Sequence, residues 1–402
     1  MKLRDLKTVT ITHKGEKSLL MGHPWVYQGE ILSHDNITNG EVVDVLNEKG
    51  KYLGSGYYNS NSLITVRIIS RNANDKFDYD FYERRVRYAW NYRKDTMSDD
   101  LNCVRIIFGE ADYLPGLTVD KFNDVLVAEI LSLGIDKNKD YIFKALLKVL
   151  KEDNYNIRGI YLRNDSKIRE KEGLEQEKRW YYLENENNNE TSTEILENII
   201  KYYVDLDNWL KTGFFLDQKY NRQLIGKLAK NKRVLDCCTH TGSFSMNAYF
   251  GGATSVTALD ISNKALEDAK HNFELNGIKD IKTISSDVFE YLKTLNGSEY
   301  DLIILDPPAF TKSRNTIKNA LKGYEELNYL GMKALKRGNY LATASCSHFA
   351  SEELFFNAIV SASKKANVDL RLISVTHASY DHPELVGVDE TKYLKFFIFQ
   401  IV

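Results

Sequence analysis

The chain has 402 residues, of which 43% are hydrophobic and 27% are charged, the ordinary balance of a globular protein. This length favours two or three domains, and the composition excludes disorder of the whole chain. The formal net charge of −2 at pH 7 neither requires nor excludes a nucleic-acid partner, because such binding depends on a local basic face. No apolar run approaches membrane-spanning length, so we expect a cytoplasmic protein without a membrane partner.

Residues 1–72 are rich in short runs that favour strands. These runs cover residues 41–47, 52–59 and 62–69, and glycines and asparagines interrupt them. The pattern predicts a small β-barrel or sandwich as the first domain.

Residues 73–188 combine a predicted helix with a predicted hairpin. Phe77, Phe81, Val86 and Trp90 could line one face of a helix. Farther along, the Asn-Asp pair at 123–124 separates two β-type runs. The stretch ENENNNETSTE at 184–194 is polar and of low complexity, which indicates an exposed connection. We therefore predict a central α/β domain that ends at residue 188.

Residues 189–402 alternate between strand and helix patterns. Apolar runs of strand length occur at 233–238, 255–260, 281–286, 301–306 and 339–345. Between the second and third runs, Ala265, Leu266, Ala269 and Phe273 form a helical stripe that ends near Gly277. Such alternation predicts a Rossmann-like parallel sheet with helices on both faces, and ligands belong at the carboxyl ends of its strands.

The first of these strands leads into a tight turn at 241–243 and then a helix, whose N-terminus favours an anion. Asp236, Asp260 and Asp287 lie at the ends of successive strands, where acidic side chains can bind a ribose or an exocyclic amino group. Aspartates in such places also cap helices, so each one alone is weak support. A dinucleotide fingerprint needs three glycines, whereas this loop has only Gly242, so the sequence favours S-adenosylmethionine.

The fourth strand ends in LDPPAF at 305–310, where two prolines fix a rigid turn beside Asp306. Such a turn suits a planar ring, and it resembles the signature of methyltransferases that act on nucleobases or amide nitrogens. Carbon 5 of cytosine needs a thiolate to add to carbon 6 before it can accept a methyl group, whereas nitrogen methylation does not. Cys346 follows the fifth strand, which should bring it near Asp306.

Other interpretations of the cysteines and of His348 stay open. Cys346 could be a small buried filler, since free cysteine is often buried. His348 could tune the thiol or cap the next helix. Cys103, Cys237 and Cys238 receive no catalytic role, and the spacing of the cysteines predicts neither a zinc site nor a disulfide framework.

The motifs in order resemble the PUA-domain family of 23S ribosomal RNA large-subunit methyltransferase I proteins, which make 5-methylcytosine with S-adenosylmethionine. The matching strings include GHPWVYQGEI, VRIIFGEADYLPGLTVDKF, TGFFLDQKYNR, VLDCCTHTGSFS, LDPPAFTKS, SCSHFASEELF and DHPELVGVDETKYLK, spread over nearly the whole chain. The resemblance implies a PUA domain at 1–72, a central domain at 73–188 and a methyltransferase domain at 189–402.

The resemblance also assigns roles to individual residues. Cys346 would be the nucleophile and Asp306 the acid that holds the base, while the group that removes the carbon 5 proton stays unassigned. The implied cofactor contacts are Phe215, Gln218, Asp236, Thr241, Gly242, Phe244, Asp260, Ile261, Asp287, Val288 and Asp306. The implied substrate contacts are Pro307, Pro308, Phe310 and Lys312, and no metal is expected.

The expected partner is large-subunit ribosomal RNA, and the expected product of the cofactor is S-adenosylhomocysteine. Lysine and arginine side chains of the first domain would engage phosphates, namely Lys2, Arg4, Lys7, Lys14 and Lys17. The target base would have to leave its stack to reach Cys346. Nitrogen methylation of a guanine or adenine, or a non-catalytic RNA-binding assembly factor, are the alternatives. A small β module also serves as a dimer surface in other proteins, so a homodimer is retained as an alternative.

Overall fold

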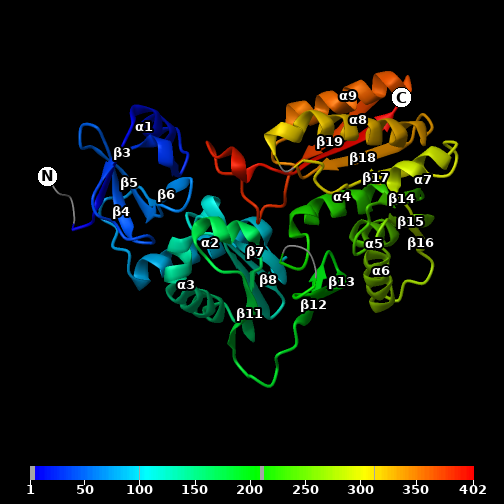
Figure 1. Cartoon of the computed structure of the whole chain (residues 1–402). Helices are drawn as coiled ribbons and strands as arrows, with labels where there is room; N and C mark the ends of the chain where they lie inside the picture. The colour runs from blue at the N-terminus through cyan, green and yellow to red at the C-terminus, as the bar shows by residue number, and fades with distance from the viewer. Residues whose placement is uncertain (1–4, 99, 209–211, 312) are drawn as a thin grey trace. The chain divides into compact units, whose positions relative to one another are not determined.

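The computed structural model describes residues 5–98, 100–208, 212–311 and 313–402. The chain forms two compact units (Figure 1). Unit 1 comprises Met1–Ile195, Val204–Leu216 and Tyr380–Thr391, and unit 2 comprises Leu196–Tyr203, Asp217–Ser379 and Lys392–Val402. In the described ranges, no helix is long and apolar enough to cross a membrane.

The first part of unit 1 is a six-stranded sheet with the order β2-β6-β5-β4-β1-β3. Its elements are β1 (Thr8–Ile11), α1 (His13–Leu20), β2 (Trp25–Tyr27), β3 (Ile31–His34), β4 (Val42–Asn47), β5 (Tyr52–Tyr58) and β6 (Ile64–Ser70). Val9, Val45, Val66 and Ile68 are among the side chains that form its core. The three strands predicted at 41–47, 52–59 and 62–69 are confirmed as β4, β5 and β6.

The second part of unit 1 is a five-stranded sheet with the order β11-β10-β9-β8-β7, accompanied by two long helices. Its elements are α2 (Tyr79–Met97), β7 (Cys103–Phe108), β8 (Leu117–Phe122), β9 (Val125–Ile130), α3 (Leu133–Glu152), β10 (Gly159–Asn164) and β11 (Glu177–Leu183). The predicted hairpin is confirmed: β8 pairs with β9, and Asn123 in the turn has a φ of 54°. Phe81, Val86 and Trp90 are buried on α2, whereas Phe77 precedes the helix.

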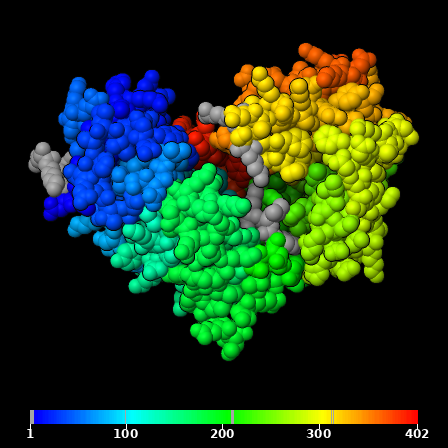
Figure 2. Space-filling view, in the orientation of Figure 1, coloured from blue at the N-terminus to red at the C-terminus, as the bar shows by residue number. Residues whose placement is uncertain are grey.

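Residues 184–190 are exposed, as the polar composition of the connection predicts, and this part projects at the lower end of the space-filling view (Figure 2). A hairpin of β12 (Ser192–Glu197) and β13 (Ile200–Asp205) follows. Its tip, Leu196–Tyr203, belongs to unit 2, while Val204–Leu216 belongs to unit 1 again and unit 2 resumes at Asp217.

A late segment of the chain returns to unit 1 between two strands of unit 2. Within unit 1, the side chain of Asp381 accepts a hydrogen bond from the backbone N–H of Arg105 at 2.9 Å. The guanidinium of Arg93, which is fully buried, donates to the backbone carbonyl of Asp381 at 2.9 Å. These contacts attach Tyr380–Thr391 to the central sheet, which the sequence did not indicate.

Unit 2 contains a seven-stranded sheet with the order β16-β15-β14-β17-β18-β20-β19. Its elements are α4 (Lys219–Leu228), β14 (Arg233–Cys237), α5 (Ser243–Phe250), β15 (Ser255–Asp260), α6 (Asn263–Leu275), β16 (Lys282–Ser285), α7 (Val288–Thr294), β17 (Leu302–Leu305), α8 (Ile317–Lys333), β18 (Tyr340–Ser345), α9 (Glu352–Ala366), β19 (Leu370–Thr376) and β20 (Lys395–Ile401). The five predicted strands are confirmed as β14 to β18 and pair in parallel. The antiparallel strands β19 and β20 complete the sheet.

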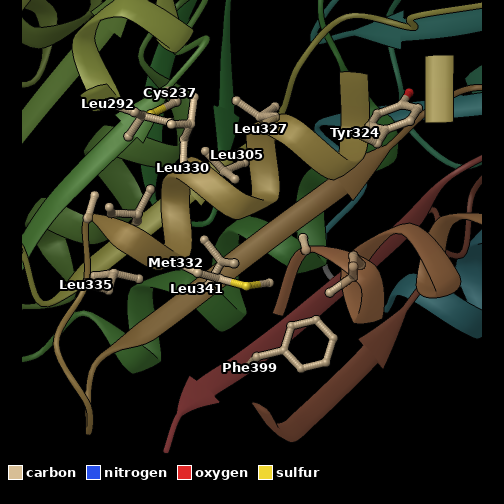
Figure 3. Close-up of a cluster of buried hydrophobic side chains, with 14 of the residues drawn as sticks. Cys237, Leu292, Leu305, Tyr324, Leu327, Leu330, Met332, Leu335, Leu341 and Phe399 are labelled. Carbon is tan, nitrogen blue, oxygen red and sulfur yellow. The ribbon is translucent and has the colours of Figure 1, made fainter. Parts of the chain in front are cut away.

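Helices cover both faces of this sheet. Successive residues of a strand point to opposite faces, so neighbouring strand residues pack against different helices. On β14, Leu235 packs into the cluster with α7, α8 and α9, whereas Val234 packs into the cluster with α4 and α5. Figure 3 shows the first cluster, with Leu305 and Leu341 of the sheet facing Leu327 and Leu330 of α8. The predicted Rossmann-like architecture is confirmed.

One buried ion pair joins the tip of the β12–β13 hairpin to α4 inside unit 2. The guanidinium of Arg222 donates two hydrogen bonds of 2.7 Å to the carboxylate of Glu197, and the two side chains are 1% and 0% exposed. Burial lowers the pKa of Arg222, but the carboxylate more than compensates, so this pKa is raised above its ordinary value.

Replacement of one member should leave the other charge buried and unpaired. We expect Glu197→Gln to lower the free energy of unfolding by about 3 kcal/mol or more, because a lone buried guanidinium is strongly destabilising. Urea unfolding followed by far-UV circular dichroism measures this change. The double variant Glu197→Leu with Arg222→Met should lose much less stability, and equal losses in the two variants would contradict this interpretation.

Candidate active site

Asp236 organises the loop that follows β14. Its side chain is 1% exposed, and its Oδ2 accepts hydrogen bonds from the hydroxyl of Thr239 at 2.5 Å and from the N–H and hydroxyl of Ser245 at 2.9 and 2.7 Å. The other oxygen, Oδ1, is buried and has no hydrogen-bond partner among the described residues. Burial raises the pKa of Asp236 to about 6, although these hydrogen bonds oppose the shift. Asp236 therefore holds the loop at 239–245 in one conformation.

Thr241, Gly242 and Phe244 lie in this loop and at the start of α5. Gly242 has a φ of 76°, and a Cβ there would lie 2.4 Å from the ring of Phe273 on α6. The glycine is thus required by packing against α6 as well as by its backbone conformation. Phe244 is 4% exposed, and its ring stacks on that of Phe396 at 5.8 Å, so its side chain belongs to the core. The carbonyl of Thr241 accepts a hydrogen bond from Asn272 at 3.1 Å.

Asp260 ends β15 and is held by two backbone amides. Its carboxylate accepts hydrogen bonds from the N–H of His240 at 3.0 Å and from the N–H of Ser262 at 2.9 Å. Ile261, directly after it, is 69% exposed despite its apolar side chain. A fixed carboxylate beside an uncovered apolar side chain can bind a ribose hydroxyl and an aromatic ring together.

Asp287 follows β16 and caps helix α7. Its Oδ1 accepts hydrogen bonds from the N–H groups of Phe289 and Glu290 at 2.9 and 3.1 Å, and the residue is exposed. The capping alternative considered for the strand-end aspartates therefore applies to Asp287. Val288 is the first residue of α7 and is partly buried.

The three aspartates are not in one register. Asp260 pairs with Ser285, and Cys237 pairs with Leu259, so Asp236 lies two positions farther back inside its strand. Asp236 is accordingly buried inside the sheet, whereas Asp260 is the last residue of β15 and Asp287 is the N-cap of α7.

Asp306 is the first residue after β17, and its orientation is set by a chain of amides. Its Oδ1 accepts a hydrogen bond from Gln218 Nε2 at 3.1 Å. The Oε1 of Gln218 accepts one from Asn221 Nδ2 at 2.6 Å, and Asn221 Oδ1 accepts one from the hydroxyl of Thr376 at 2.6 Å. Gln218 and Asp306, which lie in two separate sequence motifs, are thus hydrogen-bonded to each other. Phe215 belongs to the part of the chain in unit 1.

The Asp-Pro-Pro turn continues toward helix α8. Pro307 is buried and Pro308 is exposed. Phe310 is half-buried, and its ring lies 4.6 Å from that of the buried Tyr324. Lys312 lies outside the described residues.

Cys346 is the first residue after β18 and is partly buried. Strands β17 and β18 are parallel, with Leu305 opposite Thr343, so Asp306 and Cys346 leave the sheet at the same edge. The loops that carry them are joined, because the hydroxyl of Ser347 donates to the carbonyl of Thr311 at 3.2 Å. His348 is exposed, and Ser351, not His348, caps helix α9.

Lys395 is a residue near Cys346 that sequence reasoning missed. It is 1% exposed, lies opposite Ser345 in the sheet, and donates hydrogen bonds to the carbonyls of Ser347 and Tyr393 at 2.7 and 2.8 Å. A lysine that opens the apolar run KFFIFQI is the signal that could have identified it.

The other cysteines lie in different surroundings. Cys237 belongs to the hydrophobic core and Cys103 is buried in β7. Burial raises the pKa of the partly exposed Cys238 thiol well above its ordinary value, and nearby carboxylates raise it further. In the described ranges, no group of three or more His, Cys, Asp or Glu side chains is placed to bind a metal ion.

Unit 1 has a basic pocket of about 640 Å³ at the end of β6 and along α2. The pocket is lined by Ser70, Arg71, Asn72, Asp75, Arg84, Arg85, Tyr88 and Tyr113. Arg84 forms an ion pair with Asp75 at 2.7 Å, whereas Arg71 donates to carbonyls near the end of α1. Tyr88 is 58% exposed, so the pocket combines cationic groups with an accessible aromatic ring.

The lysines expected to contact RNA lie elsewhere on the first sheet and α1. Lys7 forms an ion pair with Glu41 at 2.8 Å, Lys14 lies 3.7 Å from Glu30, and Lys17 is exposed. Lys2 and Arg4 lie outside the described residues.

Family models match both ends of this architecture. A PUA-like domain matches residues 9–71, and an S-adenosylmethionine-dependent methyltransferase matches residues 177–364. Among solved structures, a protein from Streptococcus mutans assigned as a SAM-dependent methyltransferase has a TM-score of 0.80 at 23% identity, covering 98% of this chain and 99% of its own. SMU.776, solved in complex with SAH, has a TM-score of 0.82 at 22% identity with the same coverage. These likenesses support the fold.

Curated relatives are similar over nearly the full length. The protein named Ribosomal RNA large subunit methyltransferase I from Escherichia coli (strain UTI89 / UPEC) is 34% identical over 396 residues, which cover 96% of this chain and 97% of the relative. The protein of the same name from Pseudoalteromonas atlantica is 36% identical over 400 residues, which cover 98% and 99%. The chain therefore belongs to the ribosomal RNA large subunit methyltransferase I family and combines a PUA-like domain with an S-adenosylmethionine-dependent methyltransferase domain.

Proposed function

We propose that this enzyme methylates carbon 5 of a cytosine in large-subunit ribosomal RNA, with Cys346 as a covalent nucleophile. The observation that carries the proposal is the shared position of Asp306 and Cys346 at the carboxyl edge of β17 and β18, where Ser347 joins the two loops. The curated relatives carry the name Ribosomal RNA large subunit methyltransferase I, which supports large-subunit ribosomal RNA as the substrate class.

The residues at the β14 and β15 ends fit S-adenosylmethionine. Asp260 is oriented to accept hydrogen bonds from ribose hydroxyls, and the uncovered side chain of Ile261 would be buried by the adenine ring. The buried Oδ1 of Asp236, which lacks a partner among the described residues, suits the positive end of the methionine moiety. Thr241, Gly242 and Phe244 would contribute backbone groups, and Asp287 and Val288 would border the adenine.

Gln218 would act at the junction of both ligands. Because its Nε2 donates to Asp306 Oδ1, it would fix the carboxylate that we propose holds the cytosine. Phe215, which the family resemblance assigns to the cofactor, belongs to unit 1.

The chemistry assigned to the residues follows from the electronic structure of cytosine. Bound S-adenosylmethionine supplies an electrophilic methyl group. The thiolate of Cys346 adds to carbon 6, which makes carbon 5 nucleophilic, and Asp306 holds ring nitrogen 3 and the amino group. Carbon 5 would then bond to that methyl group, whose bond to sulfur breaks to leave S-adenosylhomocysteine. When the carbon 5 proton leaves to a base, its bonding electrons restore the ring double bond and expel the thiolate. Pro307, Pro308, Phe310 and Lys312 would border the base.

We further propose that unit 1 binds the RNA. Arg71, Arg84 and Arg85 of the basic pocket would neutralise phosphates, and Tyr88 could stack on an unpaired base. Lys7, Lys14 and Lys17 would add phosphate contacts. The division into domains at 1–72, 73–188 and 189–402 also remains a proposal, supported by the PUA-like match that ends at residue 71.

The covalent route predicts the effect of removing the thiol. We expect Cys346→Ala to lower methyl transfer to large-subunit ribosomal RNA by at least about a hundredfold, because this variant lacks the thiol that we propose bonds to carbon 6. Scintillation counting measures the transfer, and mass spectrometry of the digested RNA identifies the methylated nucleoside.

A matched cysteine variant, Cys103→Ala, should keep its activity, because this cysteine lies in unit 1 and has no proposed role. Retained activity in Cys346→Ala, or a methyl group on a guanine or adenine nitrogen, would reject the covalent cytosine route.

The cofactor assignment predicts the effect of neutralising Asp260. We expect Asp260→Asn to weaken S-adenosylmethionine binding about tenfold or more, because a hydrogen bond to a charged group contributes about 1.5–3 kcal/mol. Calorimetric titration of the purified protein measures the change. Asp268→Asn on α6, whose carboxylate pairs with Lys264, is the control and should bind normally. Unchanged affinity in Asp260→Asn would remove Asp260 from the cofactor site.

A further inference from the structure

Lys395 places a buried positive charge beside the turn that carries Cys346. Its Nζ donates to the carbonyl of Ser347 at 2.7 Å and to that of Tyr393 at 2.8 Å, and the residue is 1% exposed. Lys395 also lies opposite Ser345 in the pairing of β20 with β18. The ammonium therefore bonds to the residue after Cys346, while its own backbone pairs with the residue before it.

The groups around this ammonium determine whether it stays charged. Burial lowers the pKa of Lys395 to about 8, which Lys392 reinforces, while Cys346 and Glu352 favour the charged form. At neutral pH the group is thus mostly protonated. Glu352 is also engaged elsewhere, because its carboxylate lies 2.6 Å from His377 and 3.6 Å from Lys392.

A buried cation whose hydrogen bonds go to neutral carbonyls is costly unless an anion lies close to it. The thiol of Cys346 can become such an anion. Tyr324 also faces this region, but burial raises the pKa of its hydroxyl, so it stays neutral near pH 7.

We propose that Lys395 is a positioning residue that stabilises the thiolate of Cys346 and holds the turn at 345–347. The inference rests on the proposed role of Cys346 as the nucleophile. The thiol proton passes to solvent and Lys395 keeps its own proton, so the product is an ion pair and no bond to Lys395 forms. When the sulfur of Cys346 bonds to carbon 6, it loses its negative charge. When that bond breaks again, the charge returns to the sulfur, and the same ammonium stabilises it.

The test is the pH dependence of alkylation of Cys346 by iodoacetamide in the full-length protein, because only the thiolate reacts. Peptide mass spectrometry separates Cys346 from the other cysteines. We expect the midpoint of the wild-type profile to lie below about 8.5, the ordinary value for a free thiol. Lys395→Met should shift the midpoint upward by about one pH unit, which slows alkylation near pH 7 about tenfold.

Two variants separate charge from structure. Lys395→Arg keeps the positive charge and should restore most of the wild-type profile. Lys365→Met removes a lysine of α9 that is 64% exposed at its side chain and pairs with Glu325, and it should leave the midpoint unchanged. A Lys395→Met midpoint equal to that of the wild type would overturn the inference. If that variant does not fold, a wild-type midpoint at or above about 8.5 would overturn it.

A second measurement distinguishes this inference from the proposed function. Wild-type protein is incubated with S-adenosylmethionine and RNA containing 5-fluorocytosine, which cannot lose its carbon 5 substituent as a proton and so traps the adduct. An adduct on Cys346 together with an unshifted Lys395→Met profile would reject only the role of Lys395. A shifted profile without an adduct would support the ion pair and reject the covalent route.

Discussion

The parallel pairing of β14, β15, β17 and β18 is the constraint on which the remaining structure of unit 2 depends. Parallel strands end at the same edge, so the residues that follow them are collected there although they are far apart in the chain. Leu235 and Val234 bury opposite faces of β14 against helices, which leaves the strand ends as the places where polar groups can meet. The loops after β14 and β17, which we propose bind the cofactor and the acceptor base, are consequently neighbours by topology.

Buried polar groups behind these loops set the orientation of the loops and of Asp306. Asp236 fixes the loop at 239–245, and Gln218 with Asn221 orients Asp306. Such groups are stable only when they are hydrogen-bonded, so each contact restricts a loop to few conformations. A reacting group held in this way needs little rearrangement when a ligand binds, which favours catalysis.

The chain passes between the two units more than once. Strand β19 ends at Thr376 and β20 begins at Lys395, and between them Tyr380–Thr391 belongs to unit 1. Its contacts with Arg93 and Arg105 bury charged groups that need partners, which makes the segment an integral part of the central sheet.

The sequence by itself determined several of the strands, including the five parallel strands of unit 2, and the candidate residues that follow them. The apolar strands, the polar connection at 184–190, the Asn123 hairpin and the order of the family motifs could all be predicted, because each is encoded by neighbouring residues. Asp306 and Cys346 were likewise recognisable, since strand ends and reactive residue types are visible locally.

Only the tertiary structure decided which residues contact Asp306 and the loop that carries Cys346. Gln218 and Asp306 are 88 positions apart, and Lys395 and Ser347 are 48 apart, so no local pattern connects them. The ring of Phe244 stacks on Phe396, and Gly242 is required by Phe273 on another helix, which the loop sequence alone does not indicate. The physical reason is that hydrogen bonds and close packing act over a few ångströms in space, whatever the separation along the chain.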